Sequence, residues 1–323
     1  MDLSILIVTY NSSRYVGPLL TALRTELAPL EAEVIVVDNA SQDDTPAIVR
    51  RDHPWVRLDA SATNLGFAAG NNRGAAHARG RWLLLLNPDA LPEPGAIAQG
   101  IELMRCHPEV GLGGGELRGT DGSRQPSARM FPTLRDELFT LSGLAARRPH
   151  SRLFARLDRR WADPEQAARV DWLPGAFVFV PRELFQSLGG FDERFFMYYE
   201  EVDLCRRLAA AGHVMQYWPQ LKATHIGGAS ARTVAKARVS RAGSQLEAWR
   251  MRSALLYYRK HHGGLAAWAL QALERGWYGL RALKAGWTRR PASLRQEFLA
   301  HVAQMREAWT ATQGGRHSPQ RPW

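Results

Sequence analysis

The sequence is poor in cysteine and has no long apolar run. Its two cysteines, Cys106 and Cys205, lie far apart and show no metal-binding spacing. We therefore expect two buried thiols in a reducing compartment and no disulfide. No stretch approaches the roughly 18 uncharged apolar residues of a membrane-spanning helix, and the chain starts without a charged leader or cleavage site. These absences predict a cytoplasmic protein, which can still bind the inner face of the cytoplasmic membrane peripherally.

Acidic residues are scarce in the last quarter of the chain. Residues 231–323 contain 17 Lys and Arg against 4 Asp and Glu, whereas residues 1–230 contain 25 against 27. The net charge of +11 therefore belongs to the C-terminal region. A local excess of this kind predicts an anionic partner for that region alone, for example an anionic membrane surface. We find no nucleic-acid recognition motif, which argues against nucleic acid as that partner.

The first 115 residues alternate short apolar runs with helical patterns. The runs are apolar on both faces of a strand, so both faces of the resulting sheet must be covered. Helical patterns separate the runs, which predicts an α/β fold with a mostly parallel sheet and flanking helices. The expected buried strands are 3–10, 33–38, 82–87 and 171–180.

From about residue 245 the pattern is helical throughout. We divide the chain into a catalytic domain (1–230, with halves 1–115 and 116–230), a basic amphipathic helical extension (231–312) and a disordered tail (313–323). The extension mixes Trp, Leu and Arg, which fits in-plane binding to an anionic membrane. It equally fits a helical pair that packs on the catalytic domain or on a second subunit.

Polar residues follow several of the expected strands, at the edge where open parallel sheets bind ligands. Asp38 ends the second strand, and the acidic loop after it can hydrogen-bond a base or a ribose. The segment Asn64–Gly74 contains three glycines and opens a helix, where backbone N–H groups can approach a diphosphate. Asp89 follows the strand WLLLLN and suits a divalent ion that bridges phosphate oxygens. Taken singly, each feature also fits an ordinary turn or helix cap.

Three carboxylates crowd the first turn of a later helix, at Glu200, Glu201 and Asp203. Acidic residues stabilise helix N-termini, which explains one or two of them. They also follow the aromatic run FDERFFMYY, and a base beside apolar rings has a raised pKa and can accept a proton from a sugar hydroxyl. His225 follows the last strand and is a candidate metal or phosphate ligand, or a structural histidine. His261 and His262 end a basic helix and are expected at the surface.

The order of these segments resembles glycosyltransferase family 2. The segments are SILIVTYN, VIVVDNASQDDT, NLGFAAGNN, LLLLNPDA, WLPGAFVFV, FFMYYEEVDLCRR and ATHIGG. Within the family, the chain resembles the bacterial rhamnosyltransferase-like branch, in which Asn-Pro-Asp stands at the metal motif. The resemblance covers about residues 2–230 and implies a GT-A fold, with a nucleotide-binding half followed by an acceptor-binding half.

The resemblance also implies roles for individual residues. The donor-binding residues would be Thr9, Tyr10, Asn11, Asp38, Asn39, Gly66, Asn71, Asn72, Asn87 and Asp89. The acceptor side or wall of the active site would comprise Trp172, Gly175, Tyr199, Asp203 and Arg207. Asp89 and His225 would hold a divalent metal ion, Mg²⁺ or Mn²⁺. Glu201, with Glu200 beside it, would be the base of a single inverting displacement.

The chain departs from the family pattern at two of these positions. The family's base is the Asp of a Glu-Asp pair, and this chain has Glu201 there. The longer side chain leaves Glu200 as an alternative base. Asn87 stands where the broader Asp-x-Asp pattern has its first acid, and an amide binds metal more weakly than a carboxylate. We therefore expect low metal affinity in the absence of the donor.

The expected function is sugar transfer from a nucleotide diphosphate donor in cell-surface polysaccharide synthesis. Rhamnose on deoxythymidine diphosphate is the preferred donor, followed by UDP-sugars, and the acceptor is a saccharide or a lipid-linked saccharide. A sugar-phosphate nucleotidyltransferase is an alternative, but its Gly-rich, Arg-containing loop is replaced here by Asn11-Ser12-Ser13. A non-catalytic, membrane-associated nucleotide-binding scaffold is a further alternative. An oligomer is compatible with the sequence.

Overall fold

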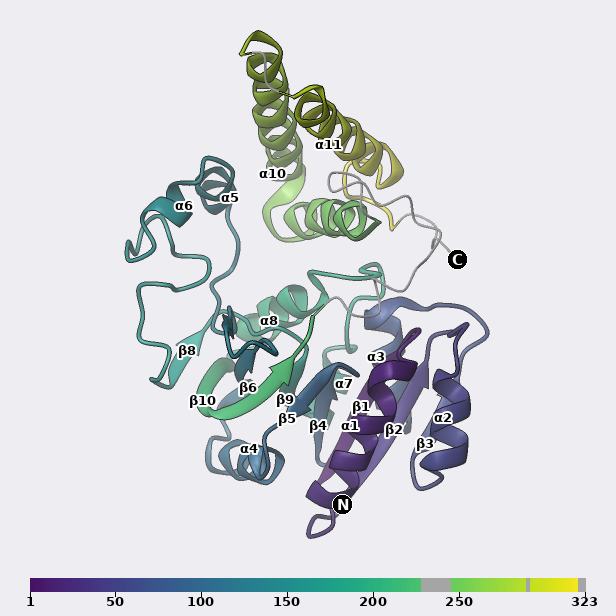
Figure 1. Cartoon of the computed structure of the whole chain (residues 1–323). Coiled ribbons are helices and arrows are strands. Elements are labelled where there is room, and N and C mark those ends of the chain that lie inside the picture. The colour runs from purple at the N-terminus through teal and green to yellow at the C-terminus, as the bar shows by residue number, and fades with distance from the viewer. Residues whose placement is uncertain (228–244, 289–290, 319–323) are drawn as a thin grey trace.

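The computed structural model describes residues 1–227, 245–288 and 291–318. Within these ranges one mixed sheet has the strand order β3-β2-β1-β4-β9-β6-β10-β5, with β7 beside β6 and β8 beside β10 (Figure 1). The strands are β1 (Leu3–Thr9), β2 (Ala32–Asp38), β3 (Arg57–Ala60), β4 (Trp82–Leu86), β5 (Ala90–Pro92), β6 (Val110–Arg118), β7 (Arg124–Gln125), β8 (Ala168–Val170), β9 (Phe177–Pro181) and β10 (Val214–His225). The helices are α1 (Ser13–Glu26), α2 (Thr45–Asp52), α3 (Gly66–His77), α4 (Ala96–Cys106), α5 (Leu134–Leu141), α6 (Leu144–Arg147), α7 (Arg182–Ser187), α8 (Glu200–Ala210), α10 (Gln245–Trp287) and α11 (Ala292–Ala311).

The predicted α/β fold is confirmed, and its parallel part is the first half of the sheet. Strands β3, β2, β1 and β4 are parallel neighbours, and the register sets Thr9 opposite Asp38 at the carboxyl edge. Beyond β4, strand β9 runs antiparallel between β4 and β6, and β6 pairs parallel with β10. The carboxyl ends of β1 and β2 therefore lie together, as the ligand edge of an open sheet requires.

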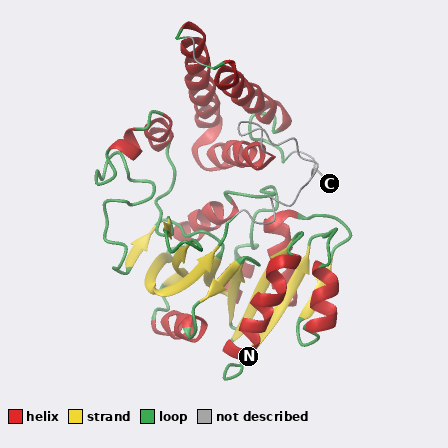
Figure 2. Ribbon diagram, viewed as in Figure 1, coloured by secondary structure: helices red, strands yellow, loops and turns green. Residues whose placement is uncertain are grey.

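Helices cover both faces of this sheet (Figure 2). Buried side chains of α1, α2 and α4 form one apolar cluster with one face. Those of α3, α7, α8 and the first part of α10 form a second cluster with the other face. Because each strand of the parallel half packs on both sides, its unbroken apolar sequence is explained.

The first part of the C-terminal helices packs on the sheet domain (residues 1–227), whereas the sequence indicated a separate helical extension. Helix α10 contains a non-helical glycine, Gly263, with φ 85° and ψ 172°, and therefore consists of two segments. Residues of the first segment, including Met251, Leu255 and Tyr257, belong to the main apolar cluster of the sheet domain. The second segment and α11 pack together and project from the domain (Figure 1). We call residues 264–287 and α11 the helix pair.

Two expectations need correction. Cys205 is buried, but Cys106, the last residue of α4, is exposed. Residues 313–316 form turns and are not part of a disordered tail, since Gly315 packs directly against the backbone of Leu255.

The domain boundary predicted at residue 230 and the tail beyond residue 318 lie outside the described residues. Among the helices that are described, none is both long enough and apolar enough to cross a lipid bilayer.

Candidate active site

Asp38 ties together the loops that follow β1 and β2. Its carboxylate accepts hydrogen bonds from the Thr9 hydroxyl at 2.9 Å and from the Ser41 hydroxyl and amide at 2.6 and 3.0 Å. The Asn39 amide donates to the Thr9 carbonyl at 2.8 Å, and its side-chain N–H₂ donates to Gly66 at 3.0 Å. The Asn39 Oδ1 atom is buried without a partner. Hydrogen bonds thus hold the loops that are predicted to bind the nucleoside, and the Asn39 Oδ1 atom is still available as an acceptor.

Two residues in these loops hold a backbone conformation that L-amino acids disfavour. Asn11 has φ 47° and Ala40 has φ 60°, in the left-handed region. Each such residue costs roughly 1–2 kcal/mol. Strain of this kind persists where the surrounding contacts impose it, and it clusters at ligand sites.

The glycine-rich segment packs against the aromatic run that precedes α8. Gly66 has φ 83°, and a Cβ there would collide with the Phe196 carbonyl, which accepts a hydrogen bond from the Phe67 amide at 2.9 Å. Asn72 bonds Phe191 in both directions, at 2.8 and 2.9 Å. Asn71 is buried and donates to the Phe67 carbonyl at 2.9 Å. Asn72 thus braces the loop before α8, while the predicted diphosphate contacts of this segment stay predictions.

Asp89 and His225 lie side by side, because β5 pairs antiparallel with the end of β10. His225 Nε2 is 3.6 Å from Asp89 Oδ1 and 3.4 Å from the Asn87 side-chain amide. The Gly227 amide donates to Asp89 Oδ2 at 3.0 Å. Gln125 donates to the His225 carbonyl at 2.6 Å, which leaves its Oε1 to accept from His225 Nδ1 at 2.8 Å. The free electron pair of a neutral His225 is therefore on Nε2, toward Asp89.

This donor set fits a divalent ion that takes further ligands from a substrate. Burial lowers the pKa of His225, against the opposing effect of the Asp89 charge, and a neutral imidazole is the form that binds metals. Among the described residues no three His, Cys, Asp or Glu side chains converge on one point. One carboxylate and one imidazole suit an ion that shares its coordination with diphosphate oxygens and water, and do not form a closed protein cage.

Glu200 and Glu201 open α8 and are short of hydrogen-bond partners. Glu200 is 4% exposed, and one carboxylate oxygen of each residue is buried with no partner. Burial, and the neighbouring charge of Glu201, raise the pKa of Glu200 well above its ordinary value. Burial raises the pKa of Glu201 to about 6. Because the charge of Glu201 raises the pKa of Glu200, Glu201 is the carboxyl that ionises first, and once ionised it can accept a proton.

Of the predicted wall residues, Gly175 lies beside Glu201 and Trp172 lies against Arg129. A Cβ on Gly175 would be 3.3 Å from the ring of Phe67 and 3.9 Å from the Glu201 Cβ. Trp172 is buried, and the guanidinium of Arg129 lies 4.5 Å from the centre of its ring. The charge of Arg129 also acts on Glu201 and opposes the effect of burial on the pKa of that carboxyl. Arg129 thus links Trp172 electrostatically to the glutamate.

The backbone turns sharply just before the glutamate pair. Tyr198 and Tyr199 both have left-handed φ values, 69° and 68°. Tyr199 packs on Tyr257 of α10, with ring centres 5.2 Å apart, and the Ser253 hydroxyl donates to the Met197 carbonyl at 2.7 Å. The first segment of α10 therefore holds this turn, and with it the start of α8.

Asp203 and Arg207, which were predicted in the wall, form an ion network that joins α8 to α10. Asp203 is fully buried, and its carboxylate lies 2.8 Å from Arg207, 2.6 Å from Lys260 and 2.7 Å from His261. Burial would raise the pKa of Asp203, but hydrogen bonds from His261 and Lys260 and the charge of Arg207 hold it below its ordinary value. His261 is thus not the surface residue we expected, since 16% of its side chain is exposed and its Nε2 meets Asp203.

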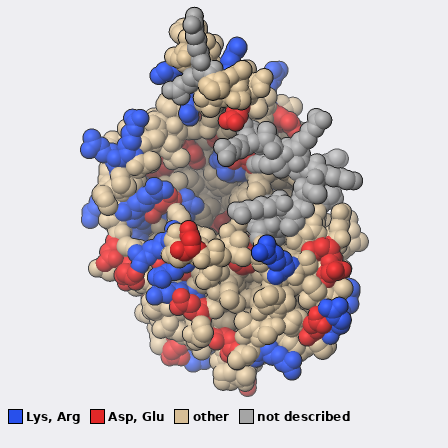
Figure 3. Space-filling model, viewed as in Figure 1, with Lys and Arg blue, Asp and Glu red and all other residues tan. Residues whose placement is uncertain are grey.

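Sequence reasoning missed several residues that shape the site. Gln125 fixes His225, and the charge of Arg129 acts on Glu201, but neither residue stood in a recognisable motif. Gly227 belongs to the segment ATHIGG, but its hydrogen bond to Asp89 was not foreseen. Lys260 and His261 were visible only as part of a basic helix. The molecule is hollowed between the helix pair and the sheet domain on the face that Figure 3 shows. The glutamate pair stands at the start of α8, below the first segment of α10.

The parallel half of the sheet continues into antiparallel strands, acidic residues lie at its carboxyl edge, and α8 begins with carboxylate side chains. This is the architecture of a GT-A glycosyltransferase. The sequence profile of Glycosyl transferase family 2 matches residues 4–160. A Mycobacterium tuberculosis N-acetylglucosaminyl-diphospho-decaprenol L-rhamnosyltransferase is 33% identical over 236 residues, which cover 69% of this chain and 75% of that protein. The chain belongs to glycosyltransferase family 2, and it is a glycosyltransferase.

Further similarities agree with this assignment. Rhamnosyltransferase WbbL of Escherichia coli is 26% identical over 235 residues, covering 68% of this chain and 82% of that one. Among solved structures, the mannosyltransferase PcManGT from Pyrobaculum calidifontis, in complex with GDP-Man and Mn²⁺, has a TM-score of 0.54 at 18% identity, covering 94% and 86% of the two chains. GalNAc-T7 with UDP, GalNAc and Mn²⁺ has a TM-score of 0.52 at 13% identity, covering 80% and 51%. These two structures support the fold alone.

Proposed function

We propose that the protein is an inverting, metal-dependent glycosyltransferase that moves rhamnose from deoxythymidine diphosphate rhamnose to a lipid-linked saccharide in cell-surface polysaccharide synthesis. The observation that carries the mechanism is the Glu200–Glu201 pair, in which each carboxylate keeps one buried oxygen without a partner and burial raises the pKa of both groups. The choice of rhamnose is supported by two relatives whose names include rhamnosyltransferase. The choice of acceptor is supported by the name of the first of them, which specifies a diphospho-decaprenol carrier.

Glu201 acts as the general base in this proposal. Its carboxylate accepts the proton of an acceptor hydroxyl while that oxygen bonds to the anomeric carbon of the donor. The bond from the same carbon to the diphosphate breaks, and one in-line displacement inverts the configuration. A pKa of about 6 suits this task, because the base is ionised at neutral pH and still basic enough to take a proton. Glu200 stays protonated and excludes a second negative charge.

The donor is bound along the edge from β1 to β5. Asn39, with its unpartnered Oδ1, and the strained loop at Asn11 contact the nucleoside. Asp89 and His225 would hold the divalent ion, which when bound neutralises charge on the diphosphate leaving group. The backbone of Gly227 and the side chain of Gln125 keep these two ligands oriented. Because the described residues supply only these two donors, the ion binds tightly only together with the diphosphate.

The acceptor enters from the hollow below the helix pair. Trp172 and Tyr199 form its apolar walls, and Arg129 orients Glu201. We place the enzyme at the inner face of the cytoplasmic membrane, where a nucleotide sugar and a lipid-linked acceptor meet. The two unpaired thiols agree with a reducing compartment.

A transfer assay tests the proposal. The purified protein is given deoxythymidine diphosphate rhamnose, UDP-sugars or GDP-mannose with a prenyl-diphosphate N-acetylglucosamine acceptor, with Mg²⁺, with Mn²⁺ or with chelator. We expect a rhamnosylated product only from the first donor and only with a divalent ion. Product from a UDP-sugar alone would replace the donor assignment, and transfer in chelator would remove the metal from the mechanism.

A further inference from the structure

The second segment of α10 is apolar on two opposite faces. One face is buried: Ala282 and Ala285 pack with Phe298 of α11, and Ala267 and Leu270 join the main apolar cluster together with Met305 and Ala308 of α11. At about 100° per residue, five large apolar residues lie within about 60° of a line on the opposite face. They are Leu265 (78% exposed), Trp268 (53%), Leu280 (66%), Leu283 (57%) and Trp287 (86%). A helix that is apolar all round is normally covered on every side.

Between these residues the exposed face carries only small uncharged side chains. Ala269, Ala272, Gly276 and Gly279 fall on the same strip of the helix, and no Lys, Arg, Asp or Glu does. The strip therefore runs from Leu265 to Trp287 along the whole segment. Contiguous exposed apolar surface of this extent marks an interaction site on a folded protein.

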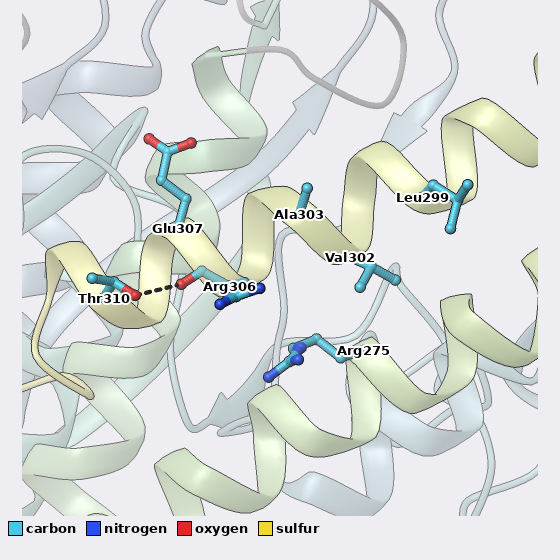
Figure 4. A pocket seen from close by; sticks show the side chains of 7 residues that line it. All are labelled: Arg275, Leu299, Val302, Ala303, Arg306, Glu307 and Thr310. Atoms are coloured by element: carbon cyan, nitrogen blue, oxygen red, sulfur yellow. Dashed lines mark hydrogen bonds between the residues drawn. The ribbon is translucent and has the colours of Figure 1, made fainter.

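A groove with a basic lining lies beside this strip, between the second segment of α10 and α11. Its volume is about 490 Å³, and its lining residues are Arg275, Leu299, Val302, Ala303, Arg306, Glu307 and Thr310. Figure 4 shows Arg275 and Arg306 entering it from the two helices, with Val302 and Leu299 toward its other end. Arg275 stands two helical turns after Trp268, on the same side of α10. The groove thus opens next to the apolar strip.

The guanidinium groups in this groove are not neutralised by the protein. Within the described residues, neither Arg275 nor Arg306 has a carboxylate at ion-pair distance, and Arg275 bonds only Gln271, at 3.0 Å. The Nε atom of Arg275 is buried and has no partner. Glu307, which also lines the groove, pairs with Arg252 at 3.4 Å. Two unpaired cations at one end and apolar side chains at the other match an amphiphile with an anionic head.

We infer that the helix pair docks the enzyme onto an anionic lipid bilayer. The apolar strip enters the acyl region, Trp268 and Trp287 lie at the interface, and the groove takes a lipid phosphate between Arg275 and Arg306. The inference deepens the proposed function, on which its choice of a lipid partner rests in part. It brings the enzyme to the membrane surface, where a lipid-linked acceptor is presented.

Charge favours a bilayer over a second copy of the chain as the occupant. The helix pair contains 5 Lys and Arg against 3 Asp and Glu, Arg275 and Arg306 have no carboxylate at ion-pair distance among the described residues, and blue side chains lie near the tip of the pair in Figure 3. In a two-fold dimer this surface would face itself, and the like charges would repel. An anionic bilayer meets both the cations and the apolar strip with complementary chemistry.

Flotation with vesicles tests the inference on the full-length protein. Vesicles of phosphatidylcholine are compared with vesicles that also contain phosphatidylglycerol, at low and at high salt. We expect binding to the anionic vesicles at low salt, and a loss of about tenfold or more in Leu283→Ser/Trp287→Ser, because two large apolar side chains no longer leave water on binding. Arg275→Gln/Arg306→Gln should lose the preference for phosphatidylglycerol. Leu138→Ser/Leu153→Ser, which alters two exposed leucines elsewhere, should bind like the wild type.

The outcomes separate this inference from the proposed function. Transfer to a water-soluble acceptor analogue without vesicles should be the same in all these variants, so a failure of transfer alone leaves the docking result intact. No vesicle binding at low salt, or an equal loss in the Leu138/Leu153 control, would overturn the docking surface. A concentration-dependent dimer that Leu283→Ser/Trp287→Ser abolishes would assign the strip to a second copy instead.

Discussion

The sheet domain and the helix pair leave opposite kinds of groups without partners. In the sheet domain, Glu200, Glu201 and Asn39 each keep a buried oxygen that bonds to nothing in the described structure. In the helix pair, the carboxylate of Glu274 is paired with His301 at 3.0 Å, whereas the cations Arg275 and Arg306 are not paired. These oxygens in the sheet domain therefore lack a proton or a cation as a partner, and these cations in the helix pair lack an anion. We read these opposite deficits as two ligand surfaces of one enzyme.

The first segment of α10 joins the two regions. It reaches α8 through Lys260 and His261, which meet Asp203, and it supports the turn at Tyr199 through Tyr257. One face of α8 thus presents an unsatisfied glutamate pair, and another presents a carboxylate saturated with cations. The pKa values follow this division, because the pKa of Glu201 is raised to about 6 and the pKa of Asp203 is held below its ordinary value. Similar residues one turn apart therefore differ in role because of their partners.

The largest effect is expected from the metal edge of the sheet domain. Asp89→Ala removes the one carboxylate of the proposed metal site, and we expect transfer to fall by on the order of 10³-fold, since charge on the leaving group is then poorly neutralised. The measurement is the initial rate of rhamnosyl transfer at saturating Mg²⁺. Asp163→Ala, which removes an exposed acid far from the edge, is the control. Equal rates in both variants would leave the metal role of Asp89 without support.

The link between the regions can be broken at Asp203. Asp203→Asn leaves Lys260 and Arg207 facing each other around a neutral amide, so we expect a loss of about 3 kcal/mol in the free energy of unfolding. Urea denaturation followed by circular dichroism measures it, with Asp163→Asn as the matched exposed control. A change below about 1 kcal/mol, the value of an exposed ion pair, would mean that the network contributes little.

A smaller effect is expected from the residue that orients the metal ligand. Gln125→Ala removes the hydrogen bond that orients the His225 ring. Replacing a residue that hydrogen-bonds a metal ligand lowers metal affinity by about tenfold or more. Titration of Mn²⁺ in the presence of deoxythymidine diphosphate measures the dissociation constant. Gln166→Ala, at an exposed position, should titrate like the wild type. Unchanged affinity in Gln125→Ala would assign that side chain a purely structural role.

The smallest effect is expected in the pH dependence of transfer. The base works only as a carboxylate, and burial raises the pKa of Glu201 to about 6. The value of kcat/KM should therefore rise with increasing pH and level off above an inflection near 6. A profile that is already level from the ordinary carboxyl range upward would show that the base is not a buried glutamate.

The sequence predicted the sheet edge well because periodicity and strand-end position are local signals. Asp38 and Asp89 could be placed from the apolar strands before them, and Glu200 and Glu201 from the aromatic run before their helix. The pairing of Asp89 with His225 came only from the family resemblance. It depends on how β5 and β10 align, which no local pattern reveals.

The helices beyond residue 245 were harder to predict. Their amphipathic pattern fits either a membrane or a protein neighbour, and it does not reveal that the first segment of α10 packs on the sheet domain while the second leaves large apolar side chains exposed. Only the bend at Gly263 separates the segment that packs on α8 from the one that projects. The contact of His261 with Asp203 spans 58 residues and has no sequence signature, so His261 was assigned to the surface.

The central claim is that Glu201 is the base and Glu200 its protonated neighbour, and one comparison of variants tests it most directly. Glu200→Gln imitates a protonated glutamate, so transfer and its pH inflection should stay close to those of the wild type. Glu201→Gln removes the base, and transfer should fall by about 10²–10⁴-fold, while Glu201→Asp should keep part of the activity. A large loss in Glu200→Gln with little loss in Glu201→Gln would contradict the account.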